Sequence, residues 1–374
     1  MKLPVPKEES FTSAAHSERV TARIGLALAV TFTTCFVTGL ISHLIQHPPG
    51  WFFWPSSPVW LYRVTQGAHV ISGIASIPLL LAKLWSVYPK LFGRPLVRSL
   101  PHALERLSIL VLSASAFFEL LTGLFNVAQN YPWNFYFPEV HYAVAWIAIG
   151  SVLVHIAVKL PVVRRALSKV DTEPELARDG LSRRGFLRTT WLTTGVAVVA
   201  TAGATVPFLR GVSTLSWRSG KGPQRVPVNR SAAGAAVIPA ALSPDWRLEV
   251  VSAKGTKRFS LAELTALPQT TAELPIACVE GWSQSATWTG VSFPDLLKAA
   301  GSEPGRDASI TSLEKNGIYA TSVLPGEHTK DARTLLALRL NGEVLDLDHG
   351  YPCRVIAPNR PGVLQTKWVS GVRV

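Results

Sequence analysis

Long apolar runs fill the first part of the chain, and short alternating runs replace them after residue 210. A helix needs about 20 apolar residues to cross the hydrocarbon core of a bilayer. Stretches of that length lie at 24–45, 60–84, 104–128, 140–160 and 190–209. Short loops join the first four, so we expect an all-α transmembrane bundle of four helices plus a fifth anchoring helix. The later alternation, broken by Gly, Pro and Asn, predicts a soluble α+β domain rich in β-structure.

These changes of pattern predict a multi-domain protein. The expected parts are an N-terminal segment (1–23), a four-helix transmembrane domain (24–165), a basic linker (166–189), a fifth transmembrane helix (190–210), a second linker (211–226) and a soluble domain (227–374). The runs 246–251 and 353–357 are the clearest strands expected in the soluble domain.

The positions of the basic residues predict an orientation. The chain has 37 Lys plus Arg against 24 Asp plus Glu, which gives a formal charge of +13. Lys and Arg gather before the first helix, between the second and third, and before the fifth, whereas the loops 46–62 and 126–140 contain none. The positive-inside rule therefore places the amino terminus in the cytoplasm and the soluble domain outside the plasma membrane. Because topology accounts for the charge, we expect membrane lipid as a partner and no nucleic acid.

The composition excludes several other classes of protein. With 48% hydrophobic and 16% charged residues and a mean hydropathy of +0.24, the chain is neither disordered nor typical of a purely soluble protein. Its three cysteines, Cys35, Cys278 and Cys353, form no C-x-x-C pair. A disulfide scaffold, a zinc ribbon and a cysteine-bound iron–sulfur cluster are therefore excluded. We interpret Cys35 and Cys353 as small buried hydrophobic residues.

The basic linker contains a possible export signal. The run Ser182-Arg183-Arg184-Gly185-Phe186-Leu187-Arg188 resembles the twin-arginine motif, which is recognised by a translocase that exports folded proteins. The simpler interpretation is that the arginine pair belongs to the positive-inside flank. Export in the folded state would fit a cofactor inserted in the cytoplasm. We expect the fifth helix to stay uncleaved, although the small residues at 200–204 resemble a cleavage site.

Two motifs in the soluble domain carry a family resemblance. The first is Ala277-Cys278-Val279-Glu280-Gly281-Trp282-Ser283, followed by Trp288-Thr289-Gly290-Val291. The second is His349-Gly350-Tyr351-Pro352-Cys353-Arg354-Val355-Ile356-Ala357-Pro358, followed by Gly362 and Lys367-Trp368. With the weaker Pro227-Val228-Asn229-Arg230, they resemble the sulfite-oxidase superfamily of molybdopterin oxidoreductases, and within it the catalytic subunits of periplasmic methionine-sulfoxide reductases. The resemblance covers residues 223–374.

The resemblance implies a role for each matched residue. Cys278 is the implied molybdenum ligand and catalytic residue, and the implied molybdopterin contacts are Asn229, Arg230, Ser312, His349, Arg354 and Lys367. A thiolate is a soft ligand that suits such a metal and leaves other coordination positions open. Arg and Lys supply the positive charge and donors that a pyrophosphate group needs. The interpretation requires the Cys278 thiol to border a cavity rather than lie in an apolar interior.

Some residues of the two motifs also have simpler interpretations. Arg354 could be a solvated charge on a strand. Trp282 and Trp288 are expected to pack rather than to take part in chemistry. Sulfite is in doubt as the substrate, because many sulfite-oxidising members have arginine near the metal cysteine, whereas here Pro275, Ile276 and Ala277 precede it. The family's immunoglobulin-like dimerisation domain does not follow the second motif, so dimerisation of that type is not expected.

Histidines in the apolar helices indicate a second cofactor. The candidates are His43, His69, His141 and His155, within or close to helices where histidine is rare without a function. They resemble the ligands of membrane b-type cytochromes, in which paired neutral imidazoles bind haem iron. His69 and His141 are expected at similar depth and can share one haem. His155 has no partner at its depth except His102, so one haem b is better supported than two. The alternative for each is a hydrogen-bonded or interfacial histidine.

The leading hypothesis is a membrane-anchored molybdopterin oxidoreductase. Oxygen-atom transfer with a small-molecule or sulfoxide-type substrate would be coupled through haem b to a membrane quinone or another electron carrier. Glu119, inside the third helix, needs a partner such as a histidine or Arg63, or serves a proton or quinone path. The alternative is a non-catalytic binding or structural module on a haem-free membrane scaffold. A transporter is disfavoured, because no inverted repeat or Gly/Pro-broken helix pair is apparent.

Overall fold

The computed structural model describes residues 11–93, 95, 97–168, 181–216 and 222–374. The expected N-terminal segment and both expected linkers lie partly outside these residues. The chain divides into two compact units. The first consists of residues 1–40, 68–202 and 211–215, and the second of residues 41–67, 203–210 and 216–374. The segment between the first two long helices therefore belongs to the same unit as the C-terminal half of the chain.

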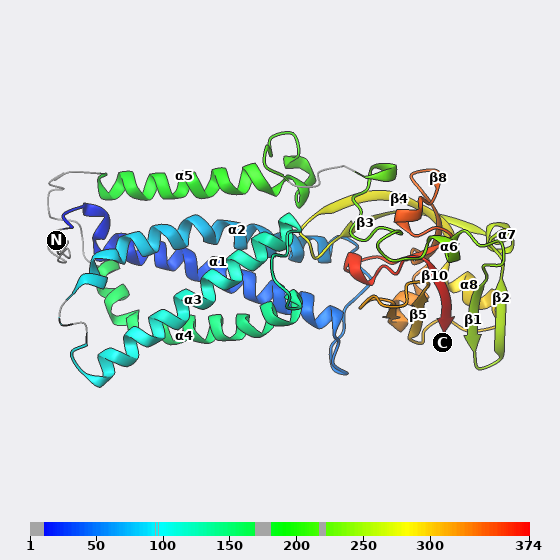
Figure 1. Cartoon of the computed structure of the whole chain (residues 1–374), viewed down its shortest axis with the longest axis horizontal. Helices are drawn as coiled ribbons and strands as arrows, with labels where there is room; N and C mark the ends of the chain where they lie inside the picture. The colour runs from blue at the N-terminus through cyan, green and yellow to red at the C-terminus, as the bar shows by residue number, and fades with distance from the viewer. Residues whose placement is uncertain (1–10, 94, 96, 169–180, 217–221) are drawn as a thin grey trace. The chain divides into compact units, whose positions relative to one another are not determined.

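Long helices dominate the first unit (Figure 1). They are α1 (Glu18–Gln46), α2 (Leu61–Val87), α3 (Leu100–Ala128), α4 (Phe137–Ser168) and α5 (Arg183–Thr201). Two of them begin at serine caps: the hydroxyl of Ser99 accepts from the His102 amide at 3.4 Å, and that of Ser182 from the Gly185 amide at 3.0 Å. Gln129, in the left-handed conformation with φ 52°, ends α3. Short 3-10 turns at Ala14–His16, Tyr88–Phe92, Ala202–Ala204 and Pro207–Leu209 flank these helices.

Among the described residues, four helices are long and apolar enough to cross a membrane. They are Glu18–Gln46, Leu61–Lys90, His102–Ala128 and Phe137–Ser168, and they match the first four predicted stretches. The fifth stretch differs from its prediction. Its helix begins at Arg183 and ends at Thr201 rather than spanning 190–209, and it is not among the helices that meet the length and hydropathy required. The physical reason is that α5 includes the arginines of the twin-arginine run and several threonines.

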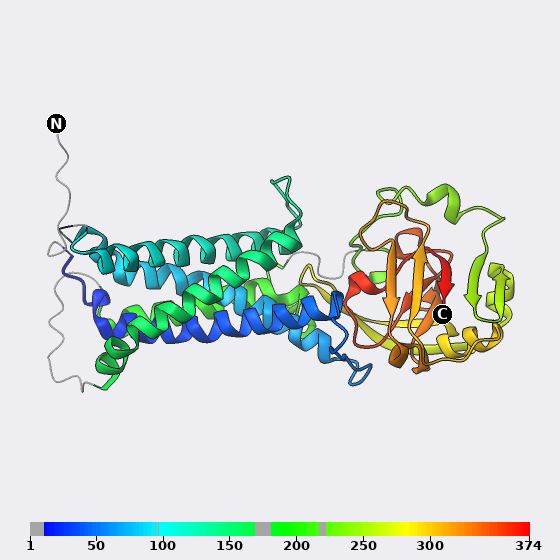
Figure 2. The ribbon, with the colours of Figure 1, turned by 90° about the horizontal axis from the view of Figure 1, so that it is seen from below.

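Contacts between helices in the first unit are both apolar and polar. Buried Val20 and Ile24 of α1 pack with Leu79 of α2 and Leu187 of α5. Further along α1 and α2, the Ser76 hydroxyl donates to the Thr31 hydroxyl at 2.7 Å. The helices α3 and α4 pack against each other as an antiparallel pair (Figure 2). The Ser76–Thr31 pair shows how hydroxyls between two apolar helices can satisfy each other.

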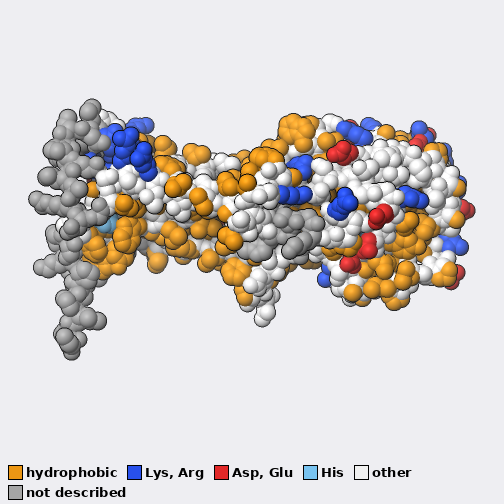
Figure 3. Space-filling model, turned by 90° about the horizontal axis from the view of Figure 1, so that it is seen from above, with side chains coloured by type: hydrophobic (Ala, Val, Ile, Leu, Met, Phe, Trp, Pro, Cys, Tyr) orange, Lys and Arg blue, Asp and Glu red, His pale blue; other side chains and the backbone are white. Residues whose placement is uncertain are grey.

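The outward faces of these helices are apolar. Large hydrophobic side chains that are more than half exposed include Leu26, Val30, Leu104, Leu107, Leu110, Leu153, Val154 and Val158. Figure 3 shows hydrophobic side chains along the visible face of the helices. A soluble monomer seldom exposes so much contiguous apolar surface. These faces therefore need apolar surroundings.

The second unit contains two five-stranded sheets in its described part. Its strands are β1 (Leu248–Ser252), β2 (Gly255–Phe259), β3 (Gln269–Ala277), β4 (Ser283–Ser292), β5 (Ala308–Ser312), β6 (Thr321–Leu324), β7 (Leu335–Leu340), β8 (Glu343–Val344), β9 (Arg354–Ile356) and β10 (Val369–Arg373). One sheet has the order β2-β1-β10-β5-β6, and the other has the order β3-β4-β7-β8 with β9 also paired to β7. Only β1 and β10 run parallel among the described strand pairs. The predicted strands at 246–251 and 353–357 are confirmed as β1 and β9.

Short helices connect the strands of the second unit. They are α6 (Ile238–Ala241), α7 (Leu261–Ala266), α8 (Phe293–Ala299) and α9 (Gly326–Lys330). Ser260 and Glu263 form a capping box at the start of α7. Ser292 caps α8, and its hydroxyl accepts from the Asp295 amide at 3.2 Å. These local signals fix where α7 and α8 start.

Buried residues from both sheets form an apolar core that includes Cys353. The prediction that Cys353 is a buried hydrophobic residue is confirmed.

Candidate functional site

Cys278 lies in a tight turn directly after β3. Its amide donates to the Trp282 carbonyl at 2.9 Å, and its carbonyl accepts from the Gly281 amide at 3.0 Å. Gly281 has φ 87°, a conformation that favours glycine. The Trp282 indole donates to a Glu280 carboxylate oxygen at 3.0 Å. The C-V-E-G-W run therefore encodes one compact turn that fixes the position of the thiol.

The Cys278 side chain has no exposed surface and packs among buried apolar residues that include Ile276 and Trp288. The expectation that the thiol borders an open cavity is therefore not met in this structure. The cause is close packing from other segments: a Cβ at Gly362 would lie 3.4 Å from the Cys278 Cα. Tyr62 is also in electrostatic range of Cys278. Burial raises the pKa of Cys278 well above its usual value, and nearby Glu280 adds to the effect.

Arg354 is the most deeply buried charge near the turn. Its side chain is 1% exposed, so the alternative of a solvated surface charge is wrong. The guanidinium donates to the carbonyls of His349 at 3.2 Å and Gln365 at 3.0 Å. Its centre lies 5.1 Å from the Trp288 ring, while its Nε is buried without a hydrogen-bond partner. No carboxylate pairs with Arg354 in the described part of the chain, and burial lowers its pKa to about 9, so it stays charged at neutral pH.

The W-T-G motif, Trp288-Thr289-Gly290, brings the Trp288 ring next to the Arg354 guanidinium. A Cβ at Gly290 would lie 2.1 Å from the Leu336 carbonyl oxygen, so only glycine lets β4 and β7 approach here. The register between these strands shifts at Thr289/Gly290. Trp288, fully buried, packs as predicted, and it also lies against the Arg354 guanidinium. Such a cation–π contact stabilises a buried charge that has no anionic partner.

Lys367 and His349 are held beside Arg354 by backbone carbonyls. The Lys367 ammonium donates to the carbonyls of Asp348 at 2.7 Å and Arg230 at 2.9 Å. Burial, and then the charge of Arg354, lower its pKa to about 7. The His349 Nε2 donates to the Pro223 carbonyl at 2.7 Å, because a carbonyl can only accept. Burial lowers the pKa of His349 to about 4, so it is neutral at pH 7.

The remaining predicted pterin residues lie around Lys367 to different extents. The Ser312 hydroxyl donates to the Lys367 carbonyl at 2.8 Å. The exposed Arg230 side chain pairs with Glu314, with Nη2 and Oε1 2.9 Å apart, so Arg230 meets the cluster through its carbonyl. Asn229 is half-buried. The structure thus brings Ser312, His349, Arg354 and Lys367 together, with Cys278 in electrostatic range of Lys367.

Sequence reasoning missed Arg360, a second buried arginine. Arg360 is 5% exposed and donates to the Val323 carbonyl at 2.8 Å, while its Nε has no hydrogen-bond partner. It precedes Pro361, which forms an isolated bridge with Ala277 next to the cysteine. In the sequence, Arg360 is marked only as a charged residue within the loop Pro358–Gly362, and a charge in a loop does not by itself predict burial. Among the described residues, Arg354 and Arg360 are thus two buried arginines without an ion pair in this region.

In the first unit, the structure brings two of the predicted haem histidines together. The rings of His69 (α2) and His141 (α4) have centroids 6.5 Å apart. The His69 Nδ1 donates to the Cys35 carbonyl at 2.8 Å. The Cys35 sulfur lies 3.6 Å from the same nitrogen, so this cysteine is a polar neighbour of His69 rather than a simple hydrophobic residue.

Glu119 and Thr122 of α3 complete the surroundings of His141. The Thr122 hydroxyl donates to the Phe118 carbonyl at 2.7 Å, so its oxygen accepts from the His141 Nδ1 at 3.0 Å. A Glu119 carboxylate oxygen lies 3.2 Å from the His141 Nε2. Of the partners predicted for Glu119, the structure therefore supports a histidine. Arg63, the other candidate, donates to the Ser285 hydroxyl at 3.1 Å.

The other candidate histidines have different neighbours. The His43 ring packs 4.8 Å from that of His47. His155 lies in electrostatic range of Lys159 and Glu105. The His102 Nδ1 accepts from the Arg98 amide at 3.2 Å. No cluster of three or more metal-ligating side chains occurs in the part of the chain that is described.

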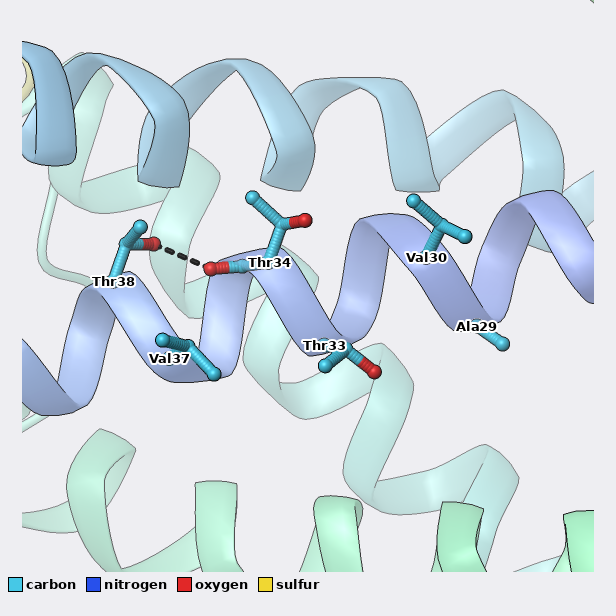
Figure 4. A pocket seen from close by; sticks show the side chains of 6 residues that line it. All are labelled: Ala29, Val30, Thr33, Thr34, Val37 and Thr38. Carbon is cyan, nitrogen blue, oxygen red and sulfur yellow. Dashed lines mark hydrogen bonds between the residues drawn. The ribbon is translucent and has the colours of Figure 1, made fainter.

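A shallow, open groove of about 500 Å³ follows α1 (Figure 4). Its lining is made by Ala29, Val30, Thr33, Thr34, Val37 and Thr38. The Thr38 hydroxyl donates to the Thr34 carbonyl at 2.6 Å and lies 3.5 Å from the His69 Nδ1. The groove is therefore continuous with the surroundings of His69.

The C-terminal sheets and the Cys278 turn lie in the part of the chain that is similar to known proteins. Residues 235–374 match the family described as the oxidoreductase molybdopterin binding domain. This part of the chain is therefore similar to the molybdopterin-binding domains of oxidoreductases of the sulfite oxidase type. The motif resemblance found in the sequence is confirmed at this level.

Curated relatives agree with this assignment. The chain is 31% identical over 34% of its length to the putative protein-methionine-sulfoxide reductase subunit YedZ1 of Azospira oryzae, covering 48% of that protein. It is 31% identical over 25% of its length to the sulfite oxidase of Arabidopsis thaliana, covering 28% of it. It is 29% identical over 34% of its length to the uncharacterized oxidoreductase YuiH of Bacillus subtilis, covering 64% of it. The chain spans less than two thirds of each of these relatives.

Proposed function

We propose that this chain is a membrane-bound molybdopterin oxidoreductase that couples oxygen-atom transfer in its C-terminal domain to electron transfer through haem b in its helices. The single observation that carries the catalytic half is the fixed Cys278 turn near Arg354 and Lys367, which have no ion pair with a carboxylate in the described part of the chain. Relatives named sulfite oxidase and putative protein-methionine-sulfoxide reductase subunit support this chemistry. We favour a sulfoxide-type or other small oxygen-bearing substrate, because Ala277 precedes the cysteine.

The residues around Cys278 fit an anionic pterin cofactor. Arg354 keeps an unused Nε donor, and Lys367 uses two of its three donors on carbonyls. Both charges are buried or half-buried without a carboxylate partner, which is costly unless an anion binds. The neutral His349 adds an imidazole without adding charge. Binding requires the side chains packed over the Cys278 thiol to move aside.

The chemistry divides between the cofactor and the protein. When bound, the cofactor supplies a metal that exchanges an oxygen atom and two electrons with the substrate. Cys278 anchors the metal, and the positive metal offsets the burial that keeps the free thiol protonated. Reduction of a sulfoxide also consumes two protons and releases the sulfide and water. The electrons for it come from a membrane quinol or another carrier, or pass to that carrier if the reaction runs as an oxidation.

Removal of the Arg354 charge should empty the pterin site. We expect Arg354→Met to lower molybdopterin content at least about tenfold, because it removes a charged donor fork. Arg354→Lys keeps the charge but not the fork, and should give an intermediate content. Pterin is measured by fluorescence after extraction and compared with molybdenum per chain. Arg339→Met is the matched control, since Arg339 is exposed and also donates to a carbonyl, that of Gly342. Wild-type pterin content in Arg354→Met would contradict the assignment.

The pair His69 and His141 supports the haem half of the proposal. Both rings donate through Nδ1 to protein oxygens, which leaves each Nε2 lone pair for a metal, as in many histidine-ligated sites. The ring centres of His69 and His141 lie 6.5 Å apart, which supports a single haem iron that both imidazoles would hold. Iron at the His141 Nε2 would replace its contact with Glu119. Thr38 of α1 lines the shallow groove on that helix and also lies 3.5 Å from the His69 Nδ1.

The membrane placement rests on the sequence pattern and the apolar helices. We infer that the four apolar helices cross the plasma membrane, with a cytoplasmic amino terminus and an extracytoplasmic catalytic domain, as the distribution of Lys and Arg indicates. The twin-arginine run, which forms the first turns of α5, would direct the folded domain to its translocase. α5 itself would anchor the domain without cleavage.

One preparation tests both halves of the proposal. The full-length protein is purified in detergent, and its molybdenum and iron contents are measured beside absorption spectra before and after dithionite. The proposal expects molybdenum near one per chain and a reduced b-type α-band. A preparation with neither metal nor α-band would instead support the non-catalytic alternative.

A further inference from the structure

The segment 41–67 packs over the Cys278 turn within the second unit, and we call it the roof segment. Its buried Ile45 and Tyr62 pack in one cluster with Ala277 and Leu364. Tyr62 is 1% exposed and is in electrostatic range of Cys278. Gln66 reaches the turn itself, because its amide donates to the Val279 carbonyl at 3.4 Å. The roof segment therefore contributes to the complete burial of the thiol.

Asn359 fastens the roof segment to the C-terminal domain from two sides. Its Oδ1 accepts from the Tyr62 amide at 2.6 Å, and its Nδ2 donates to the Pro55 carbonyl at 2.7 Å. Its own carbonyl accepts from the Trp54 indole at 2.8 Å. Asn359 is 1% exposed and has φ 56°, a left-handed conformation that asparagine tolerates better than most residues. One side chain thus joins both ends of the stretch 55–62 to the loop that carries Arg360.

Two further contacts hold the roof segment along its length. The Arg333 guanidinium donates to the Ser57 hydroxyl at 2.6 Å and is itself fixed by Asp331. At the other side, the Tyr319 hydroxyl donates to the Gln46 side chain at 3.0 Å. Because these contacts already order the roof segment, little conformational entropy remains to be lost when it lies over the Cys278 turn. We therefore expect the segment to open rarely.

The roof segment also places a hydroxyl donor near the thiol. The Gln46 amide donates to the Ser42 oxygen at 3.3 Å, and the Ser42 hydroxyl lies 3.1 Å from that of Tyr62. With Ser42 donating to Tyr62, the Tyr62 proton points to the Gln66 oxygen at 3.4 Å. That distance is at the outer limit of a hydrogen bond. Either hydroxyl of the Ser42–Tyr62 pair can be the donor. In the arrangement in which Ser42 donates, the Tyr62 proton is weakly used and available to an oxygen acceptor bound beside Cys278.

We propose that the roof segment restricts the Cys278 site to small, free oxygen-bearing substrates, such as low-molecular-weight sulfoxides, and excludes a sulfoxide carried on a folded protein. The inference rests on the proposed function and names the substrate class of the same site. A methionine-sulfoxide side chain on a protein brings its backbone and neighbours with it. Those groups would have to displace 54–62 and break the Asn359 contacts, whereas a small molecule needs only local side-chain movement.

The test compares small and protein-bound substrates on the full-length, metal-loaded protein in detergent. Dimethyl sulfoxide and free methionine sulfoxide are compared with oxidised casein, with a reduced viologen as electron donor. We expect kcat/KM for casein-bound methionine sulfoxide to be at least about a hundredfold below that for the free amino acid. Asn359→Gly removes the side-chain clamp without straining the left-handed backbone. It should raise the casein rate about tenfold or more, the equivalent of roughly one or two lost hydrogen bonds.

Asn341→Gly is the matched control. Asn341 also has a left-handed backbone, φ 50°, and also joins two segments, since it accepts from the Thr287 amide at 3.0 Å and donates to the Gln224 carbonyl at 2.8 Å. It does not touch the roof segment, so its variant should keep the wild-type substrate ratio. Tyr62→Phe should lower kcat/KM for free sulfoxides while casein remains a poor substrate.

Hydrogen–deuterium exchange of the peptide covering 50–62 supplies a readout that does not depend on turnover. The peptide should exchange slowly in the wild type and in Asn341→Gly, and faster in Asn359→Gly. A wild-type protein that reduces casein-bound and free methionine sulfoxide at similar kcat/KM, or a roof peptide that exchanges as fast as an unprotected loop, would overturn the proposal. Protein that contains molybdenum but reduces no sulfoxide contradicts the proposed reaction instead, and the exchange result then decides whether the roof exists.

Discussion

Replacing Cys278 by serine should abolish turnover and release molybdenum, while the fold of the C-terminal domain survives. We expect a loss of about a thousandfold or more in kcat for the small substrate, because a serine hydroxyl is a hard ligand that stays protonated at neutral pH. The substitution is nearly isosteric, so the turn made by the Cys278 amide and the Trp282 carbonyl should persist. Activity, molybdenum per chain and the circular dichroism of the protein are the measurements.

Cys353→Ala is the control for this loss. Both cysteines have no exposed surface, but Cys353 lies in a different apolar cluster, between the strands of the core. Its variant should lose some thermal stability, as expected for a smaller core side chain, and keep its molybdenum. If Cys278→Ser retained metal and turnover, or if Cys353→Ala lost both equally, the thiol would not be the ligand.

Replacing either His69 or His141 by alanine should remove the b-type spectrum. Both residues would hold the haem iron, so loss of either should lower haem content about tenfold or more and abolish the reduced α-band. The molybdenum content should stay unchanged, because the catalytic domain has its own ligands. Electron delivery from a quinol should then fail, whereas turnover with a reduced viologen acting directly on the catalytic domain should continue.

His16→Ala is the matched control for the histidine pair. The His16 ring also contacts a backbone carbonyl, that of Ser86, at 3.3 Å, but His16 has no histidine partner at metal-binding distance among the described residues. Its variant should keep the full α-band. His155→Ala should also keep it if the protein holds one haem, and a halved haem content in that variant would indicate two. An unchanged spectrum in both His69→Ala and His141→Ala would refute the proposed haem site.

Local sequence predicted the elements better than it predicted their ends. The first four apolar stretches are helices, because length and hydropathy are local properties that a membrane span requires. The fifth helix was misplaced by several residues at each end, since the arginines and threonines after Ser182 lower its hydropathy without preventing a helix. The alternation around β1 and β9 was sufficient to predict strands.

By itself, the sequence determined which residues are available for chemistry. Three features can be read directly from the sequence. They are the turn at Cys278, the glycine that lets β4 approach β7, and the histidines within apolar helices. Each depends on neighbours in the chain or on a motif with fixed spacing, and such interactions do not require knowledge of distant segments.

Only the tertiary structure decided which residues meet. Trp288 lies against Arg354, His69 faces His141, and Asn359 holds Tyr62 although 297 positions separate them. Contacts of this kind arise when distant segments bury apolar surface together, and the polar groups caught between them must then find partners. No local pattern marks such a pairing, which is why the roof segment and the buried arginines became visible only in three dimensions.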